Sequence, residues 1–101
     1  MVNGMKKIGI MGSTGSIGTQ TLEIVRKYPD RLQVTALAAG SNVKLLEEQV
    51  REFEPRLAVM WTAKAAEDLR DRISDLNTAV ICGMDGLLQM AALPEMDILV
   101  T

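Results

Sequence analysis

The stretch that decides the fold is Gly12-Ser13-Thr14-Gly15-Ser16-Ile17-Gly18, in which glycine recurs at every third position. An apolar run at residues 7–11 precedes it and has the character of a buried strand. After it come residues that are spaced like one face of a helix: Ile17, Thr21, Ile24 with Val25, and Tyr28. A strand, a glycine-rich turn and a helix in this order form the context that a dinucleotide-binding loop requires.

Each glycine of this stretch has its own expected role. Gly12 allows a tight turn out of the strand, Gly15 lets a pyrophosphate approach backbone that a Cβ would block, and Gly18 lets the helix pack tightly on the sheet. The free N–H groups of the helix start, at the positive end of the helix dipole, then face the phosphates. We expect three hydroxyl groups to add donors at the same place, those of Ser13, Thr14 and Ser16.

A second apolar run, residues 33–38, follows at the distance of a β-α-β unit. Sites that prefer NAD place Asp or Glu at the end of this strand to hold the ribose 2′-hydroxyl. This chain has Gly40-Ser41-Asn42 there, with no carboxylate to repel a 2′-phosphate and with Lys44 nearby, so NADP is favoured over NAD. Asn42 has an alternative role as the cap of a helix that begins at Val43. Both roles are compatible, because a capped helix start is itself an anion site.

Length and composition exclude several classes of protein. A chain of 101 residues holds one domain at most. Its 11 basic and 13 acidic residues are interspersed and give a net charge of −2, which indicates neither a nucleic-acid surface nor a charged tail. No apolar run approaches the roughly 18 residues that span a membrane. The single cysteine, Cys82, cannot form an internal disulfide, and with no secretory signal in view this favours the cytoplasm.

The chain contains no histidine, which removes the usual general base and the usual transition-metal ligand. The carboxylates of the expected helices fall on solvated faces and are not clustered for metal binding. We therefore assign no catalytic residue and no metal ligand within these residues, and we expect any complete active site to need further chain.

Strand and helix patterns alternate along the rest of the sequence. Strands are expected at residues 57–61, 79–82 and from 97 onward, and helices at 43–53, 63–73 and 85–93. This alternation predicts an α/β fold, a Rossmann-like doubly wound parallel sheet with helices on both faces. We expect the strand order 3-2-1-4-5, with the sheet cut off after its fifth strand. Trp61 closes the third strand and could line an adenine pocket, although packing is the interpretation that we favour.

Several stretches carry a resemblance to a known family. They are residues 8–22, Tyr28-Pro29-Asp30-Arg31, Ala36-Leu37-Ala38-Ala39-Gly40-Ser41-Asn42 and Phe53-Glu54-Pro55-Arg56-Leu57-Ala58-Val59-Met60. From Lys6 to Thr101 the chain resembles the start of 1-deoxy-D-xylulose 5-phosphate reductoisomerase. The resemblance implies an NADPH-dependent enzyme of non-mevalonate isoprenoid biosynthesis. Such an enzyme converts 1-deoxy-D-xylulose 5-phosphate to 2-C-methyl-D-erythritol 4-phosphate and needs Mg²⁺ or Mn²⁺.

The same resemblance implies which residues hold the cofactor. Thr14, Gly15, Ser16 and Ile17 would hold the pyrophosphate side of NADPH. Gly40, Ser41 and Asn42 would hold the 2′-phosphate side. Family members often carry Lys or Arg where this chain has Ser41, so Lys44 is the candidate to supply the missing charge.

The family's full chain is several times longer, and its metal ligands, substrate phosphate site and lid lie beyond the part that this chain resembles. Residues 1–101 are therefore expected to be the dinucleotide-binding domain of a longer enzyme, without activity of its own. Residues 97–101 would be an apolar sheet edge through which the chain could self-associate. Two alternatives are another NADP-dependent oxidoreductase, similar to aspartate-semialdehyde dehydrogenase, and a free-standing nucleotide-sensing module.

Overall fold

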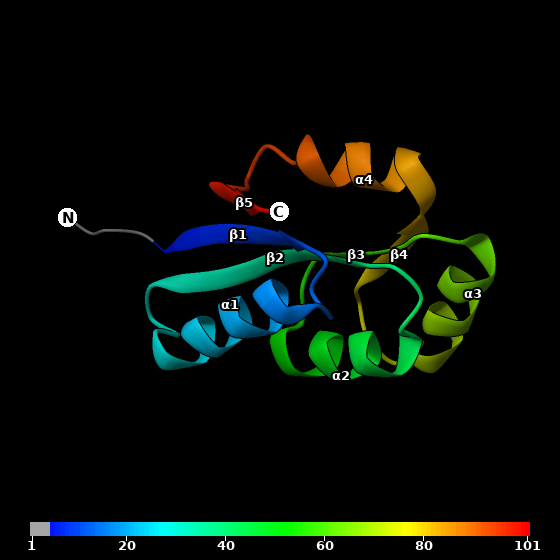
Figure 1. Cartoon of the computed structure of the whole chain (residues 1–101), viewed down its shortest axis with the longest axis horizontal. Coiled ribbons are helices and arrows are strands. Elements are labelled where there is room, and N and C mark those ends of the chain that lie inside the picture. Colours follow the sequence, from blue (N-terminus) through cyan, green and yellow to red (C-terminus); the bar gives the residue numbers. More distant parts are fainter. Residues whose placement is uncertain (1–4) are drawn as a thin grey trace.

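Short apolar runs form the strands of the computed structural model, which describes residues 5–101. The strands are β1 (Lys6–Met11), β2 (Leu32–Ala39), β3 (Leu57–Met60), β4 (Ala79–Cys82) and β5 (Ile98–Val100). The helices are α1 (Ser16–Lys27), α2 (Val43–Phe53), α3 (Ala63–Arg72) and α4 (Gly83–Ala91). Figure 1 shows a single sheet with α1, α2 and α3 on one face and α4 on the other. Within residues 5–101, every helix is too short or too polar to span a lipid bilayer.

The order of the strands across the sheet is β4-β3-β2-β1-β5, and all neighbours are parallel. The doubly wound parallel α/β sheet is as expected, but the expected order 3-2-1-4-5 is wrong. β4 pairs with β3, and β5 takes the place beside β1 that was expected for β4. The reason is the face on which each helix crosses. Because parallel crossovers are right-handed, α1, α2 and α3 all carry the chain in one direction, and α4 carries it back past β1.

The sheet divides the core into two clusters, because successive side chains of a strand point to opposite faces. Leu37 of β2 is fully buried and belongs to the larger cluster, to which α1, α2 and α3 contribute. Its neighbours on the strand belong to the smaller cluster under α4, which comprises Ala36, Ala38, Leu57, Val59 and Met90. A single helix therefore covers the face of the sheet that carries this second cluster.

The helix face expected for α1 is wrong except at Val25, which is buried. Ile17, Ile24 and Tyr28 are 61%, 50% and 53% exposed, and the buried positions are Gly18, Leu22 and Val25. The cause lies at Gly18, where an added Cβ would stand only 2.6 Å from Ser13 Cα. This approach requires Gly18 to face inward, and helical spacing then turns Leu22 and Val25 inward as well.

The next two helices each bury one face. Leu46 and Val50 of α2 are fully buried, and Ala66, Leu69 and Ile73 line the inner side of the α3 segment. α4 begins at Gly83, earlier than expected, and ends at Ala91 before Pro94.

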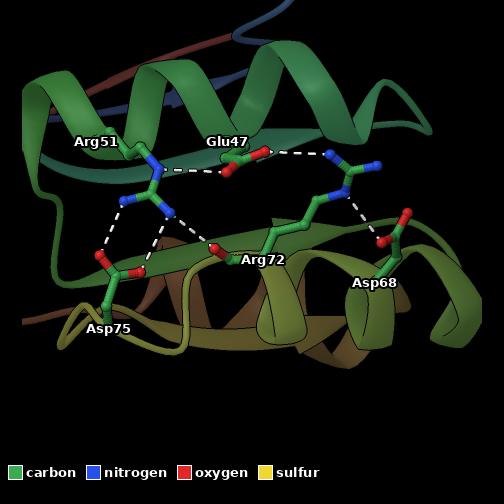
Figure 2. A network of polar contacts seen from close by, with 5 residues as sticks. All are labelled: Glu47, Arg51, Asp68, Arg72 and Asp75. Carbon is green, nitrogen blue, oxygen red and sulfur yellow. Dashed lines mark hydrogen bonds and ion pairs between the residues drawn. The ribbon is translucent and has the colours of Figure 1, made fainter.

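A network of ion pairs joins α2 to α3 (Figure 2). Arg51 donates to Asp75 at 2.9 Å and to Glu47 at 3.2 Å. Arg72 donates to Asp68 at 3.0 Å and to Glu47 at 3.2 Å, so Glu47 links the two arginines. The hydrogen bond from Arg51 lowers the pKa of Asp75. Exposed pairs of this kind contribute little energy individually, but together they set the position of α2 against α3.

A second ion pair joins α1 to α2. The guanidinium of Arg26 makes a two-point contact with Glu52, at 2.6 Å from Nε and 2.7 Å from Nη2, and its Cζ lies 5.2 Å from the centre of the Phe53 ring. Hydrogen bonding by Arg26 holds the pKa of Glu52 below its ordinary value of 4.5. The contact fixes the relative position of the two helices whose first turns carry the candidate site.

This pair makes stability depend on pH. A carboxyl whose pKa is lower in the folded than in the unfolded state stabilises the fold above its unfolded pKa, and the contribution is lost as the pH falls through the folded value. Glu52→Gln should therefore lower the free energy of unfolding at pH 7 by less than about 1 kcal/mol, because both side chains are 45% exposed.

Urea denaturation at pH 7 and at pH 3 measures this effect. The difference between Glu52→Gln and the parent should shrink as the pH is lowered from 7 to 3, because a growing share of Glu52 becomes protonated as the pH falls. Glu48→Gln is the matched control, since Glu48 is also exposed on α2 and makes no ion pair within residues 5–101. An equal loss at both pH values would show that the pair does not act through its charge.

Candidate dinucleotide-binding site

The two segments singled out from the sequence lie together at one edge of the sheet. β1 and β2 are parallel, with Met11 paired to Ala38, so the loops that follow them emerge at the same edge. The Ser13 backbone N–H donates to Ala38 O at 2.9 Å and joins the start of one loop to the end of the other strand. Each loop leads into the first turn of a helix, α1 or α2. In open α/β sheets this carboxyl edge is where ligands bind.

The glycine loop, residues 12–18, is a tight turn that depends on its glycines. Gly12 has a φ of 72°, in the left-handed region, as a sharp exit from β1 requires. The Gly15 N–H donates to Gly12 O at 3.0 Å and closes the turn. A Cβ on Gly18 would collide with that same Gly12 carbonyl. The sequence had suggested that Gly18 lets the helix pack on the sheet. The structure shows instead that Gly18 lies against the backbone of the loop.

The first turn of α1 is open to a ligand. Gly15 is the N-cap and supplies no side-chain hydrogen bond, and the first turn contains no acidic residue. Gly15, Ser16 and Ile17 are exposed, and Thr14 is half-buried. The first backbone N–H groups of a helix have no partner within the helix, and they sit at the positive end of its dipole. This arrangement suits a phosphate group.

Ser13 does not belong to the open part of the loop. Its residue is completely buried, so the expectation that its hydroxyl would face a phosphate is wrong. The reason is the backbone bond to β2, which draws Ser13 beneath the loop. Thr14 and Ser16 remain as the hydroxyl donors on the accessible side.

Gln49 of α2 supports the loop from below, and the sequence analysis missed it. Its Nε2 donates to Ser13 O at 3.0 Å, and the side chain is only 4% exposed. Gln49 Oε1 and Ser13 Oγ are both buried without a hydrogen-bond partner in residues 5–101. A signal was available, because Gln49 falls on the same helix face as the inward-pointing Leu46 and Val50. A polar residue at such a position normally has a buried partner.

The second segment, residues 40–42, opens α2. Asn42 Oδ1 accepts a hydrogen bond from the Leu45 N–H at 3.2 Å, which confirms its role as the helix cap. Gly40 is exposed, and a Cβ there would meet nothing within 4 Å. Ser41 and Asn42 are also exposed, and no carboxylate is present in the segment or in the first turn of α2. The edge therefore presents two neighbouring helix starts with no negative side chain between them.

An apolar pocket of about 210 Å³ lies between these two segments. It is lined by Met11, Gly12, Ala38, Ala39, Gly40, Val59, Trp61 and Leu87. Trp61 is 52% exposed, so the favoured expectation that it packs in the core is wrong. It follows Met60, the last residue of β3, and lines this pocket.

A larger hollow, of about 530 Å³, lies at the opposite edge of the sheet. Its lining includes Lys7, Arg56, Asp75 and Glu95, and Arg56 is paired with Glu95 across it. The amino ends of the strands form this edge, and neither helix start of the site reaches it. Size alone is therefore a poor guide to the functional site of this protein.

Comparison with known proteins identifies the family. The model of the family described as 1-deoxy-D-xylulose 5-phosphate reductoisomerase matches residues 8–101. The chain belongs to this family. The match replaces the alternative of an enzyme similar to aspartate-semialdehyde dehydrogenase.

Curated members of the reductoisomerase family show the extent of the similarity. The chain is 52% identical over 97 residues to the 1-deoxy-D-xylulose 5-phosphate reductoisomerase of Desulfitobacterium hafniense strain Y51, covering 96% of this chain and 26% of the relative. It is 54% identical over 97 residues to that of Lachnoclostridium phytofermentans, covering 96% and 25%. The chain thus spans about a quarter of the length of the relatives that it matches.

Solved structures of the family show the same fold. A crystal structure of DOX-P reductoisomerase in complex with NADPH, fosmidomycin and magnesium superposes with a TM-score of 0.90 at 31% identity, over 94% of this chain and 24% of that one. The enzyme from Zymomonas mobilis in complex with NADPH gives a TM-score of 0.86 at 29% identity, over 93% and 25%. Within residues 5–101 of this chain, no group of three or more Asp, Glu, Cys or His side chains could hold a metal ion. The residues described here therefore do not fit a magnesium site of their own.

The support of the glycine loop by Gln49 can be tested directly. Gln49→Met keeps a side chain of similar shape but leaves Ser13 O buried without its donor, and it should lower the free energy of unfolding by about 1–3 kcal/mol. Ser13→Ala is the matched control: it removes a hydroxyl that has no partner and should change stability by less than about 1 kcal/mol. Urea denaturation of the two variants measures both values. Equal stability of Gln49→Met and the parent would show that the buried bond does not hold the loop.

Proposed function

We propose that this chain is the NADPH-binding domain of a 1-deoxy-D-xylulose 5-phosphate reductoisomerase. The observation that carries the proposal is the uncapped first turn of α1, which faces the carboxylate-free segment 40–42 across the carboxyl edge of the sheet. A dinucleotide with a 2′-phosphate needs two anion sites, one after the first strand and one after the second. The NADPH in complexes of solved relatives supports the choice of cofactor.

The two segments divide the cofactor between them. Thr14, Gly15, Ser16 and Ile17 hold the pyrophosphate, through the backbone N–H groups of the loop and helix start and the two hydroxyls. Gly40, Ser41 and Asn42 hold the 2′-phosphate at the start of α2. Lys44, exposed in the first turn of α2, adds a positive charge to this segment. NADPH, once bound, supplies a hydride; residues 5–101 bind and orient it.

The complete reaction requires more than these residues. In our proposal the whole enzyme is an oxidoreductase of non-mevalonate isoprenoid biosynthesis. It takes 1-deoxy-D-xylulose 5-phosphate to 2-C-methyl-D-erythritol 4-phosphate in the cytoplasm, with Mg²⁺ or Mn²⁺. The chain spans about a quarter of its relatives and offers no metal cluster in its described part. Residues 1–101 are accordingly the dinucleotide-binding domain and, taken alone, turn over no substrate. In this proposal the domain serves a longer enzyme. A free-standing nucleotide sensor, the remaining alternative, would not need a catalytic region.

Two substitutions test the cofactor site. Gly15→Val should abolish binding of both NADPH and NADH, because the branched side chain occupies the space of the pyrophosphate. The residue has a φ of −86°, which valine can adopt, and a Cβ would lie 3.4 Å from Gly12 O, so the fold should survive. Ser41→Asp should weaken NADPH at least about tenfold and leave NADH unchanged, because a carboxylate repels the 2′-phosphate.

Isothermal titration calorimetry with each cofactor measures these affinities, and circular dichroism confirms that the variants fold. The parent should bind NADPH more tightly than NADH. Tighter binding of NADH by the parent would overturn the role of residues 40–42. Normal binding by a folded Gly15→Val variant would show that the phosphates do not lie over the glycine loop.

The 101-residue chain should also self-associate through β5. This strand lies at the edge of the sheet and pairs only with β1 among the described residues. Ile98 and Leu99 are 44% and 37% exposed, and an unpaired apolar edge is a template for another chain. Multi-angle light scattering over a concentration series should show a mass that rises from monomer toward dimer. Leu99→Lys should keep the chain monomeric, and a parent that is itself monomeric at high concentration would disprove the expectation.

A further inference from the structure

Gln49 lies beneath the glycine loop and bonds to its backbone. We propose that its side-chain amide sets the orientation of the Ser13–Thr14 peptide group, so that the Thr14 N–H is presented to the pyrophosphate of the dinucleotide. Gln49 is then a positioning residue, which acts on the ligand through the loop and does not touch it. The inference rests on the proposed function, since it concerns how the same site is shaped.

The carbonyl of Ser13 is held by a single donor. Within residues 5–101, Gln49 Nε2 is the only group that donates to Ser13 O, at 3.0 Å. A carbonyl oxygen accepts hydrogen bonds and cannot donate them, so the nitrogen end of the amide has to face it. Gln49 Oε1 has no partner in the same part of the chain, so the bond to Ser13 O is the one hydrogen bond that this buried side chain makes there.

The N–H of Thr14 points to the opposite side of the loop. The Ser13–Thr14 peptide is trans, and in a planar trans peptide the C=O and the following N–H lie on opposite sides. Since the Ser13 carbonyl points inward to the buried Gln49, the Thr14 N–H points outward, away from α2. It makes no hydrogen bond within residues 5–101, and the next residues, Gly15 and Ser16, are exposed. The group is therefore available to an anion beside the first turn of α1.

Loss of the Gln49 amide would free this peptide group to rotate. The N–H of Ser13 is fixed by Ala38 O at 2.9 Å, but its carbonyl would be left buried without a donor. A buried carbonyl without a partner is unfavourable, and rotation of the peptide toward the open side of the loop relieves this by exposing the oxygen to water. The rotated peptide presents an oxygen to the phosphates where the N–H had been, so an attraction is replaced by a repulsion.

Gln49→Met tests the orientation, because it removes the donor and keeps a side chain of similar length. It should weaken NADPH and NADH by the same factor, roughly 10- to 100-fold, since both contain the pyrophosphate. Adenosine 2′-monophosphate carries the 2′-phosphate without a pyrophosphate, and its affinity should stay within about twofold of the parent value. Val50→Ala is the matched control: Val50 is a fully buried neighbour on α2, so its truncation lowers stability but leaves the loop bond in place, and all three affinities should be unchanged.

NMR titration of the isotope-labelled chain measures these affinities and observes the Thr14 amide directly. Its resonance should shift strongly when NADPH is added to the parent and to Val50→Ala, and weakly in Gln49→Met, because an N–H that bonds to a phosphate changes its chemical environment most.

Gln49→Glu provides a rescue that depends on pH. Its carboxyl can donate to Ser13 O only while it is protonated, so the NADPH affinity of this variant relative to the parent should rise as the pH is lowered from about 8 to about 5. The groove between α1 and α2 that position 49 lines already holds several charged side chains, those of Glu23, Arg26, Glu48 and Glu52. Its excess of carboxylates disfavours ionisation of a further one. Should Gln49→Met fail to fold, this ratio decides the question, and a ratio that does not change with pH would contradict the proposal.

The outcomes distinguish this inference from the function beneath it. If Gln49→Met folds and binds NADPH as the parent does, the amide does not position the loop, and the proposed function stands. If NADPH and adenosine 2′-monophosphate weaken by the same factor, Gln49 acts through the position of the whole of α2, and the inference is overturned. If the parent binds neither NADPH nor NADH, the proposed function fails and this inference fails with it.

Discussion

The close approach of Gly18 to the backbone of Gly12 and Ser13 is the constraint on which the rest of the site depends. There is no room for a Cβ at Gly18, so the first turn of α1 can lie directly against the loop that leaves β1. This contact sets the rotation of the whole helix, burying Leu22 and leaving Ile17 outside. It also brings the uncapped helix start to the edge of the sheet, where its N–H groups are available to an anion.

Two sets of interactions hold that edge in shape. Beneath the loop, Gln49 of α2 donates to Ser13 O, and Ser13 is in turn bonded to β2, so loop, strand and second helix form one unit. On the surface, the Arg26–Glu52 pair joins α1 to α2, and the network around Glu47 joins α2 to α3. The buried bond is the stronger determinant, because leaving a buried carbonyl unpaired costs more than losing an exposed ion pair.

Much of the site could be predicted because it depends on local chemistry. The φ of Gly12, the cap at Asn42 and the absence of a carboxylate at residues 40–42 are properties of short segments, and the structure shows all three. Ser13, Gln49 and Trp61 could not be placed in this way. Ser13 is drawn inward by a bond to Ala38, and Gln49 reaches a partner 36 positions away in the sequence. Trp61 follows β3 directly and is half-exposed, which the apolar character of the strand does not reveal.

By itself, the sequence determined the alternation of strands and helices, the first residues of α2 and α3, and the glycine loop between β1 and α1, since periodicity, caps and glycines act within a few residues. Only the tertiary structure decided the strand order β4-β3-β2-β1-β5, the rotation of α1 and the apolar pocket. The physical reason is that the strand order and the pocket depend on which face of the sheet a helix covers, and the rotation of α1 depends on the contact between Gly18 and the backbone of Gly12 and Ser13. Because crossovers are right-handed, the face that a helix covers decides on which side of the previous strand the next strand lies. α4 is the helix on the face opposite α1, α2 and α3, and its Leu87 lines the pocket.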